Sequence, residues 1–473
     1  NYIQTALRYH NDNPGVHFQA ARYSYSQEDY DQAFYHVSTA LQLRPQYAEA
    51  LLLKALLLLR MNQPKGGQEA IEQLLELDPA SVRAWYVYAI IVDQSGDSAQ
   101  AISHLHRALQ LDPANEYVRA TYESLLRNLE DLETDERQHA ASYHVRLAHA
   151  YENENLFSRA RFHYRRALQL YPFSWDARLG YAQSFERQNL YGKYLEELYL
   201  LRDLRSEDQN VADAIEIFEN LRLESVSQRW EIDQFSLERQ GPKVQLFIHA
   251  DLPQYPLLFD YISTYVQDVF LASRRADFHM NVESCTGRGE AFGIARQNNS
   301  EYYLILEPDI FDTGVLLHYR VFLSRTGSLL YEGSVIREGA QSFSRALLYA
   351  QEAVEKLFPV QALVISRHFR TAIIDRGILD GLEVDNELPI YRARSGLSRS
   401  DSPGLLFVEA DRLATFVIER LDDSIAEGRI EANGYFDTVA VGDIVVLQPE
   451  GYTEPPPELQ IFPPLYRRIR ALD

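Results

Sequence analysis

The sequence has few of the features that mark disulfide-stabilised, membrane-spanning or nucleic-acid-binding proteins. Its single cysteine, Cys285, cannot form a disulfide within the chain, which fits both a reducing cytosol and an envelope protein with a large core. No apolar run approaches the ~18 residues of a membrane span, and the longest candidate, residues 50–61, contains Lys54. The net charge of −22 disfavours a duplex nucleic acid. We therefore expect no nucleic-acid partner and no transmembrane segment.

Motifs of catalysis and metal binding are also missing. The chain has no G-x-S-x-G and no Walker lysine, and His104 and His106 would point to different faces of a helix. The glycines of TGRGEAFG, residues 286–293, are spaced one residue off the dinucleotide fingerprint. No acidic residue is clearly placed after the next strand to hold a ribose, so we interpret this segment as a flexible strand-to-helix turn with Arg288 near the helix start. We predict that the protein is not an enzyme and binds no cofactor or metal.

What the sequence does contain is a repeated phrase. TALQLRP ends at Pro45, QLLELDP at Pro79 and RALQLDP at Pro113, so the phrase recurs with a spacing of 34 residues. This is the period of two antiparallel helices and a turn, in which proline ends the second helix. Small residues recur with the same period, as needed where the two helices cross closely. One such set is Ala33, Gly67 and Ala101.

The fourth copy of the phrase departs from the 34-residue spacing. RALQLYP ends at Pro172, which is 59 residues after Pro113 and therefore one period plus 25 residues. We interpret the extra segment, near residues 114–138, as a spacer helix followed by an acidic loop. A degenerate fifth copy follows at 175–204, and a helix at 211–223 is expected to cap the stack, because an open end would expose its apolar face.

With this period and these in-phase small, aromatic and proline positions, residues 1–226 resemble the tetratricopeptide family, which implies an all-α solenoid that binds proteins. The resemblance implies that the first helix of each unit lines a concave groove. The groove residues expected from it are Phe18, Arg22, Tyr25, Leu52, Leu56, Leu59, Tyr86, Ile90, Asp93, Val145, His149 and Glu152. The apolar groove at units two and three either receives a partner segment or is filled by the chain's own helix at 114–129.

Residues 240–359 alternate short apolar runs with amphipathic helices in the order βαβαβββα, which predicts an α+β domain. The last two strands are expected to turn at Thr326-Gly327. The phrases GIARQNNSEYYLILEP and VFLSRTGSLLYEGSV resemble the domain shared by CsgG, the TolB amino-terminal domain and the middle of the flagellar ring protein FlgT. That resemblance implies a role in bacterial envelope assembly.

Residues 360–452 contain short strands separated by turn signals at Asp380-Gly381 and Gly442-Asp443, which predict a small β-barrel. The phrases DGLEVDNELPIYR and VAVGDIVVLQP resemble the SH3-like carboxy-terminal domain of FlgT. The proline-rich tail, 453–473, favours an extended conformation and ends in a basic stretch. It either docks on a neighbouring subunit or lies on its own barrel.

The sequence thus predicts a multidomain protein: an all-α TPR solenoid followed by an α+β domain and a small SH3-like β-barrel. The resemblances imply a periplasmic scaffold of a bacterial cell-envelope assembly, as an accessory (collar or ring) component of the flagellar motor. The alternative is a TPR lipoprotein that recruits cell-wall or outer-membrane machinery. Expected partners are other proteins of such a complex, with self-assembly a further option. Asn1 in place of Met fits a removed signal or lipoprotein leader, so a lipid anchor upstream is compatible with the sequence.

Overall fold

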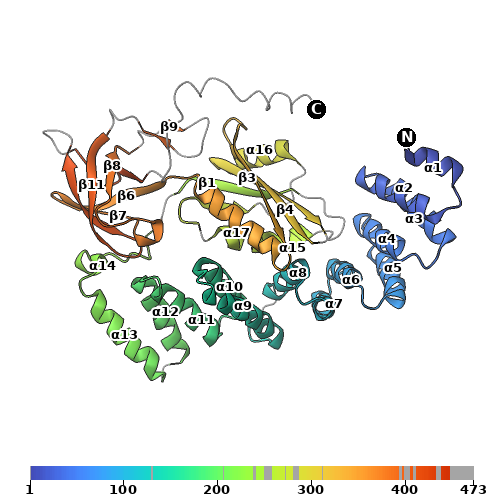
Figure 1. The fold of residues 1–473 in the computed structure, drawn as a ribbon, viewed down its shortest axis with the longest axis horizontal. Helices are drawn as coiled ribbons and strands as arrows, with labels where there is room; N and C mark the ends of the chain where they lie inside the picture. The colour runs from blue at the N-terminus through green and yellow to red at the C-terminus, as the bar shows by residue number, and fades with distance from the viewer. Residues whose placement is uncertain are drawn as a thin grey trace. The chain divides into compact units, whose positions relative to one another are not determined.

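The computed structural model divides the chain into two compact units. The first comprises Asn1–Arg222, Pro242–Val354 and Ser400–Ser402, and the second comprises Leu223–Gly241, Glu355–Arg399 and Pro403–Asp473. Figure 1 shows the elements of each. The residues that the structure describes are 2–128, 131–205, 207–237, 241–249, 258–271, 273–280, 287–311, 313–393, 397–398, 405–407, 412–432 and 438–447. The predicted tail at 453–473 lies outside them.

The amino-terminal part of the first unit is a stack of helical hairpins (Figure 1). The helices are α1 (Tyr2–Tyr9), α2 (Pro14–Ser26), α3 (Tyr30–Leu43), α4 (Ala48–Arg60), α5 (Pro64–Leu77), α6 (Val82–Gln94), α7 (Ser98–Leu111), α8 (Glu116–Arg127), α9 (Asp135–Asn153), α10 (Phe157–Leu170), α11 (Trp175–Glu186), α12 (Tyr191–Leu204) and α13 (Gln209–Arg222). Five hairpins, from α2–α3 to α11–α12, match the five predicted copies. The expected end helix, α13, packs on α12 through Val211 and Ile215.

Each hairpin turns through one residue in the left-handed backbone region. These residues are Glu28 (φ 60°), Asn62 (56°), Gly96 (92°), Asn155 (59°) and Asn189 (58°). They fall at the same place in every unit, between its first and second helix. Glycine and asparagine tolerate this conformation best, so four of the five positions carry a residue suited to it and Glu28 does not. The turn within each hairpin therefore has a periodic backbone signal of its own, whereas the repeated prolines lie after the second helix of each unit.

The extra segment between units three and four continues the stack. Helix α8 packs against α7 on one side and against α15 (Leu258–Phe270) on another. The expected acidic loop is shorter than predicted, because Thr134 caps α9 and two acidic residues of that loop, Asp135 and Glu136, form its first turn. Arg137 is buried and donates to the carbonyl oxygens of Leu126 at 2.6 Å and Leu170 at 2.6 Å, which joins the ends of α8 and α10.

The rest of the first unit is a five-stranded sheet with the strand order β2-β1-β3-β4-β5 among the described residues. Strand β1 pairs in parallel with β2 and β3, whereas β3, β4 and β5 are antiparallel. The elements are β1 (Lys243–Ile248), α15, β2 (Asp277–Met280), α16 (Arg288–Gln297), β3 (Tyr302–Phe311), β4 (Gly314–Leu323), β5 (Leu329–Glu338) and α17 (Ser342–Glu355). Their order is the predicted one, and Gly327 takes a φ of 71° at the expected turn.

The second unit contains a closed barrel, whose described strands follow the order β11-β12-β7-β6-β13-β8. They are β6 (Val360–His368), β7 (Thr371–Ile374), β8 (Glu387–Tyr391), β11 (Arg412–Leu421), β12 (Ala426–Ala432) and β13 (Ile444–Leu447), and β9 (Leu397–Ser398) pairs with β10 (Leu405–Leu406) beside them. A short helix, α14 (Val226–Arg229), packs on this barrel, because Asp422 accepts from the backbone N–H groups of Val226 and Ser227. Gly381 and Gly442 adopt positive φ at the two predicted turns.

Candidate functional site

All but one of the predicted groove residues of units one and two gather around one cavity of about 680 Å³ in the first unit. The lining residues are Ile3, Phe18, Gln19, Arg22, Tyr23, Tyr25, Ser26, Glu49, Leu52, Leu53, Leu56 and Arg83. Five of them were expected from the repeat pattern: Phe18, Arg22, Tyr25, Leu52 and Leu56. Helices α2 and α4 supply most of the lining because their hairpins stack side by side, so that their first helices face the same hollow.

The predicted residues of unit three do not line this cavity. Tyr86 and Ile90 are fully buried, and Leu59 of unit two is 5% exposed. All three belong to the apolar core cluster that extends from the second repeat to the fifth. Asp93 accepts a hydrogen bond from Ser98 Oγ at 2.6 Å, next to the hairpin turn. The repeat pattern identifies which helix face these residues share, but it does not show how tightly neighbouring helices close over that face.

The predicted residues of unit four form a separate group. Val145 is half-buried against the solenoid core. The side chain of His149 is 54% exposed and lies 3.6 Å from Glu152, which is buried and accepts from Tyr164 Oη at 2.8 Å. Between this group and unit three stands α8, which packs mainly on α7 and α15 as the next layer of the stack. Its residues are absent from the lining of the cavity at units one and two.

The cavity combines an apolar floor with charged side chains at its border. Phe18 packs on Tyr47 with ring centroids 5.0 Å apart. Arg22 and Arg83 are exposed, and neither makes an ion pair with any described residue, whereas Glu49 is the carboxylate in the lining. An apolar surface with unpaired guanidinium groups is suited to a segment that carries aliphatic or aromatic side chains and a carboxylate.

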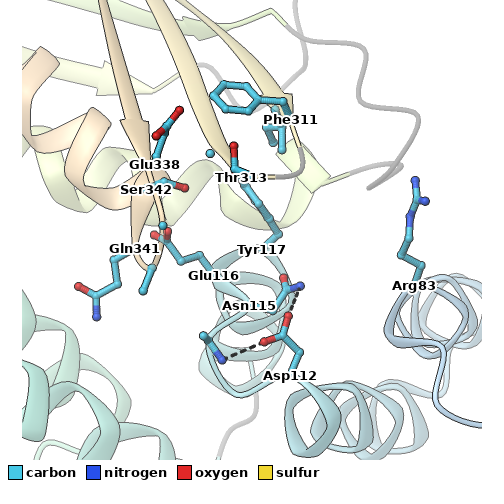
Figure 2. Close-up of a pocket in the computed structure, with 15 residues that line it drawn as sticks. Arg83, Asp112, Asn115, Glu116, Tyr117, Phe311, Thr313, Glu338, Gln341 and Ser342 are labelled. Carbon is cyan, nitrogen blue, oxygen red and sulfur yellow. Dashed lines mark hydrogen bonds between the residues drawn. The ribbon is translucent and has the colours of Figure 1, made fainter.

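Arg83 also lines a second cavity, of about 710 Å³, which lies where the repeats meet the five-stranded sheet. Figure 2 shows Arg83 on one side of this cavity, with Thr313 and Glu338 of the sheet domain on the other. On the side of this cavity formed by the repeats, Asp112 accepts a hydrogen bond from Asn115 Nδ2 at 3.1 Å. The linings of the two cavities therefore share one arginine of α6.

Glu116, the first residue of α8, joins the two parts of the first unit at this second cavity. Its carboxylate accepts from the backbone N–H groups of Phe343 at 3.0 Å and Ser344 at 2.9 Å, and from Ser344 Oγ at 2.7 Å. These groups form the first turn of α17, where a carboxylate satisfies free N–H groups and complements the helix dipole. Burial raises the pKa of Glu116 even though these hydrogen bonds favour its ionised form.

A buried ionic network holds the sheet domain against the fourth repeat. Arg166 of α10 has a side chain only 1% exposed; its Nη1 donates to Asp268 Oδ2 of α15 at 2.6 Å and its Nη2 to Glu123 Oε2 of α8 at 2.7 Å. Arg127 of α8 donates to the same Asp268 oxygen at 2.8 Å. The guanidinium carbon of Arg166 lies 4.9 Å from the centre of the Tyr265 ring. Removing one partner would leave a buried charge unpaired, so this network fixes the register between the repeats and the sheet domain.

Two histidines extend the network inside the fourth repeat. His144 Nε2 lies 2.8 Å from Glu123 Oε1, and the Nδ1 atoms of His144 and His163 are 3.0 Å apart. Burial lowers the pKa of both imidazoles, most strongly that of His163, so both are neutral near pH 7. Burial alone would raise the pKa of Glu123, but the Arg166 guanidinium and the hydrogen bond with His144 hold that pKa well below its usual range.

The glycine-rich segment near 286–293 shows no phosphate cradle in its described part. Gly287 precedes α16 with an extended backbone, at φ 175°. Arg288 donates to the carbonyl oxygen of Gly327 at 2.9 Å and lies over the Phe322 ring, with 4.6 Å between its guanidinium carbon and the ring centre. The arginine near the helix start thus holds the β4–β5 turn. Among the described residues no group of three potential metal ligands gathers, and no described helix is long and apolar enough to span a bilayer.

Comparison with known proteins identifies the helical part. Tetratricopeptide family models match residues 24–91, 82–115 and 145–208. Residues 24–115 and 145–208 are tetratricopeptide repeats. The gap between the matched ranges contains α8, the helix that the sequence marks as an insertion in the repeat period. A model for the second domain of the TPASS_0648 family matches residues 243–356, which is the region of the five-stranded sheet.

Individual proteins are similar to part of this chain. A stretch of 75 residues is 35% identical to human protein O-mannosyl-transferase TMTC3, over 16% of this chain and 8% of that protein. Among solved structures, YrrB, described as a TPR protein with an unusual peptide-binding site, is 15% identical, with a TM-score of 0.26 over 45% of this chain and 97% of that one. MamA is 16% identical, with a TM-score of 0.22 over 42% and 94%.

Proposed function

We propose that the protein is an interaction scaffold that binds a segment of another protein in the groove of its first two tetratricopeptide repeats. The observation that carries this proposal is the cavity of about 680 Å³, with its apolar floor and the two unpaired arginines at its border. The buried network around Arg166 supports a second element of the proposal. Because the fourth repeat is locked to the sheet domain, a partner in the groove would be held in a fixed position relative to that domain.

Site-specific photocrosslinking in cells tests the groove. Tyr23 lines the cavity and is 55% exposed, whereas Tyr35 lies outside the lining and is 61% exposed, so p-benzoylphenylalanine at the two positions forms a matched pair. We expect a discrete crosslinked protein from position 23 and none from position 35. The Arg22→Glu variant should weaken the position-23 product about tenfold, the equivalent of ~1.4 kcal/mol. Equal products at both positions would refute the groove as the binding site.

We further propose that the scaffold serves a bacterial cell-envelope assembly in the periplasm, as an accessory collar or ring component of the flagellar motor. The support is the resemblance of residues 240–359 and 360–452 to envelope and flagellar ring domains, together with the scaffold architecture. Cryo-tomography of a deletion strain is the direct test. Motors that lack peripheral density are expected, and motors that look complete would exclude the motor assignment. Crosslinks to cell-wall or outer-membrane machinery would favour the alternative, a recruiting lipoprotein.

A further inference from the structure

The tip of the β6–β7 hairpin, defined here as residues 367–370, carries an aromatic side chain in an unfavourable setting. Phe369 is 93% exposed, so it contributes almost nothing to the barrel core. Its backbone φ is 51°, in the left-handed region that bulky residues rarely adopt. Asparagine or glycine would suit this position better. A residue that costs stability in both respects indicates a role outside folding.

The hairpin tip is held rigidly by the barrel. Arg367 Nε donates to the carbonyl oxygen of Phe369 at 2.8 Å, and its Nη1 donates to the carbonyl oxygen of Val439. The backbone N–H of Ile430 donates to the carbonyl oxygen of Arg370 at 2.7 Å. These bonds fix the backbone from which the Phe369 side chain projects. A backbone that is already ordered loses little conformational freedom on binding, which favours an interaction anchor.

The charge of the hairpin tip is opposite to that of the chain. Arg367, His368 and Arg370 surround Phe369, whereas the whole chain carries a net charge of −22. The rings of Trp230 and His368 lie 5.1 Å apart at the base of the tip. Arginine and aromatic side chains dominate binding hot spots, and a basic rim selects an acidic surface. The side chains of the tip therefore indicate two properties of the site that would receive it: an apolar pocket for Phe369 and carboxylates for the basic side chains around it.

We propose that this hairpin tip docks into a second protein that presents an apolar pocket bordered by carboxylates. The inference is independent of the groove, because the tip belongs to the other compact unit. A lipid surface fits less well, because one aromatic side chain is a weak anchor and anionic lipids repel an acidic chain. A second copy of the chain fits less well, because two chains of −22 repel one another.

The test places p-benzoylphenylalanine at position 369 of the full chain in the cells that produce it, with Val384, 52% exposed in the same unit, as the control position. We expect one crosslinked protein at 369, none at 384, and a crosslink site that maps to an apolar pocket flanked by Asp or Glu. The Arg370→Glu variant should reduce this product about tenfold. Crosslinks to lipid, to a second copy, to no protein, or to a site without carboxylates would overturn the proposal.

A second variant separates docking from folding. Phe369→Asn relieves the left-handed strain, so its thermal midpoint should equal or exceed that of the parent chain. To follow docking in this variant, the photocrosslinker is moved to position 368, which is also exposed. The product at 368 should fall about tenfold when residue 369 is Asn. A lower midpoint would mean that Phe369 supports the barrel, and an unchanged product would mean that it does not bind.

Discussion

Residues 107–113 and 166–172 differ at one position, RALQLDP against RALQLYP, yet their arginines have opposite environments. Arg107 is exposed and donates to the side chain of Gln110, one turn away. Arg166 is buried between Glu123 and Asp268. The difference lies in what each helix faces, because α10 packs on α15 of the sheet domain. The same phrase thus serves as a solvent-exposed helix surface in the third repeat and as an interdomain joint in the fourth.

Replacing each arginine in turn should give the largest contrast. Arg166→Ala leaves the buried Glu123 without its arginine and removes one of the two arginines that bind Asp268, so it should lower the free energy of unfolding by about 3–5 kcal/mol. Arg107→Ala removes one exposed hydrogen bond and should change it by less than about 0.5 kcal/mol. Chemical denaturation of the two variants beside the parent protein measures both values. If the two substitutions cost the same, the buried network does not join the domains.

This comparison also marks the limit of what the sequence could predict. The repeat period predicted the hairpins, and the alternation of short apolar runs and helices predicted the sheet domain, because both patterns are local. The joint is not local, because Arg166 and Asp268 are 102 residues apart. Arg166 and Arg107 are the same residue type at the same position of the repeat, so the repeat pattern alone cannot distinguish them. The one available signal was the 25-residue insertion, whose helix α8 supplies Glu116, Glu123 and Arg127.

The groove likewise could be predicted only in part from the sequence. The repeat pattern placed Phe18, Arg22 and Leu52 on one helix face, and the structure brings them to one cavity. It placed Tyr86 on the equivalent face of unit three, but that side chain is fully buried. Periodicity defines the direction of a side chain, whereas the depth of the groove depends on how closely successive hairpins pack. Arg83, which lines both cavities, falls outside the slots that the pattern assigns to the groove.

Acidification should weaken the joint at the fourth repeat more than the open repeats. His144 and His163 are neutral in the folded protein, with pKa values lowered by burial. The unfolded chain takes up these protons first, near pH 6.5, so stability holds above that pH and falls below it. Each imidazole should cost up to about 1.4 kcal/mol at pH 5.5. The readout is the denaturation midpoint between pH 7.5 and 5.5.

Substitution of one buried imidazole tests this pH dependence. His163→Gln should flatten the slope, since one of the two buried titrating groups is removed. A parent protein whose stability is constant over this range would contradict the assignment of neutral, buried imidazoles.

Substitutions in the hairpin turns should have the smallest effect on the free energy of unfolding. They should also distinguish the first repeat from the others. Glu28 has a φ of 60°, where the second, fourth and fifth repeats have asparagine and the third has glycine. Glu28→Asn should therefore raise the free energy of unfolding by about 0.5–1 kcal/mol, because asparagine tolerates the left-handed region better. Asn62→Glu should lower it by a similar amount. Thermal unfolding of both variants gives the comparison, and equal midpoints would mean that the turns carry no strain.

Hydrogen exchange of the parent chain and the Arg166→Ala variant tests the central claim most directly. If the ionic network binds the sheet domain to the fourth repeat, the substitution should remove amide protection from α8 and α15 together. Helices α2 to α4, at the open groove, should keep theirs. Unchanged protection in α15, with losses confined to α10, would show that the repeats and the sheet domain are not held together by this network.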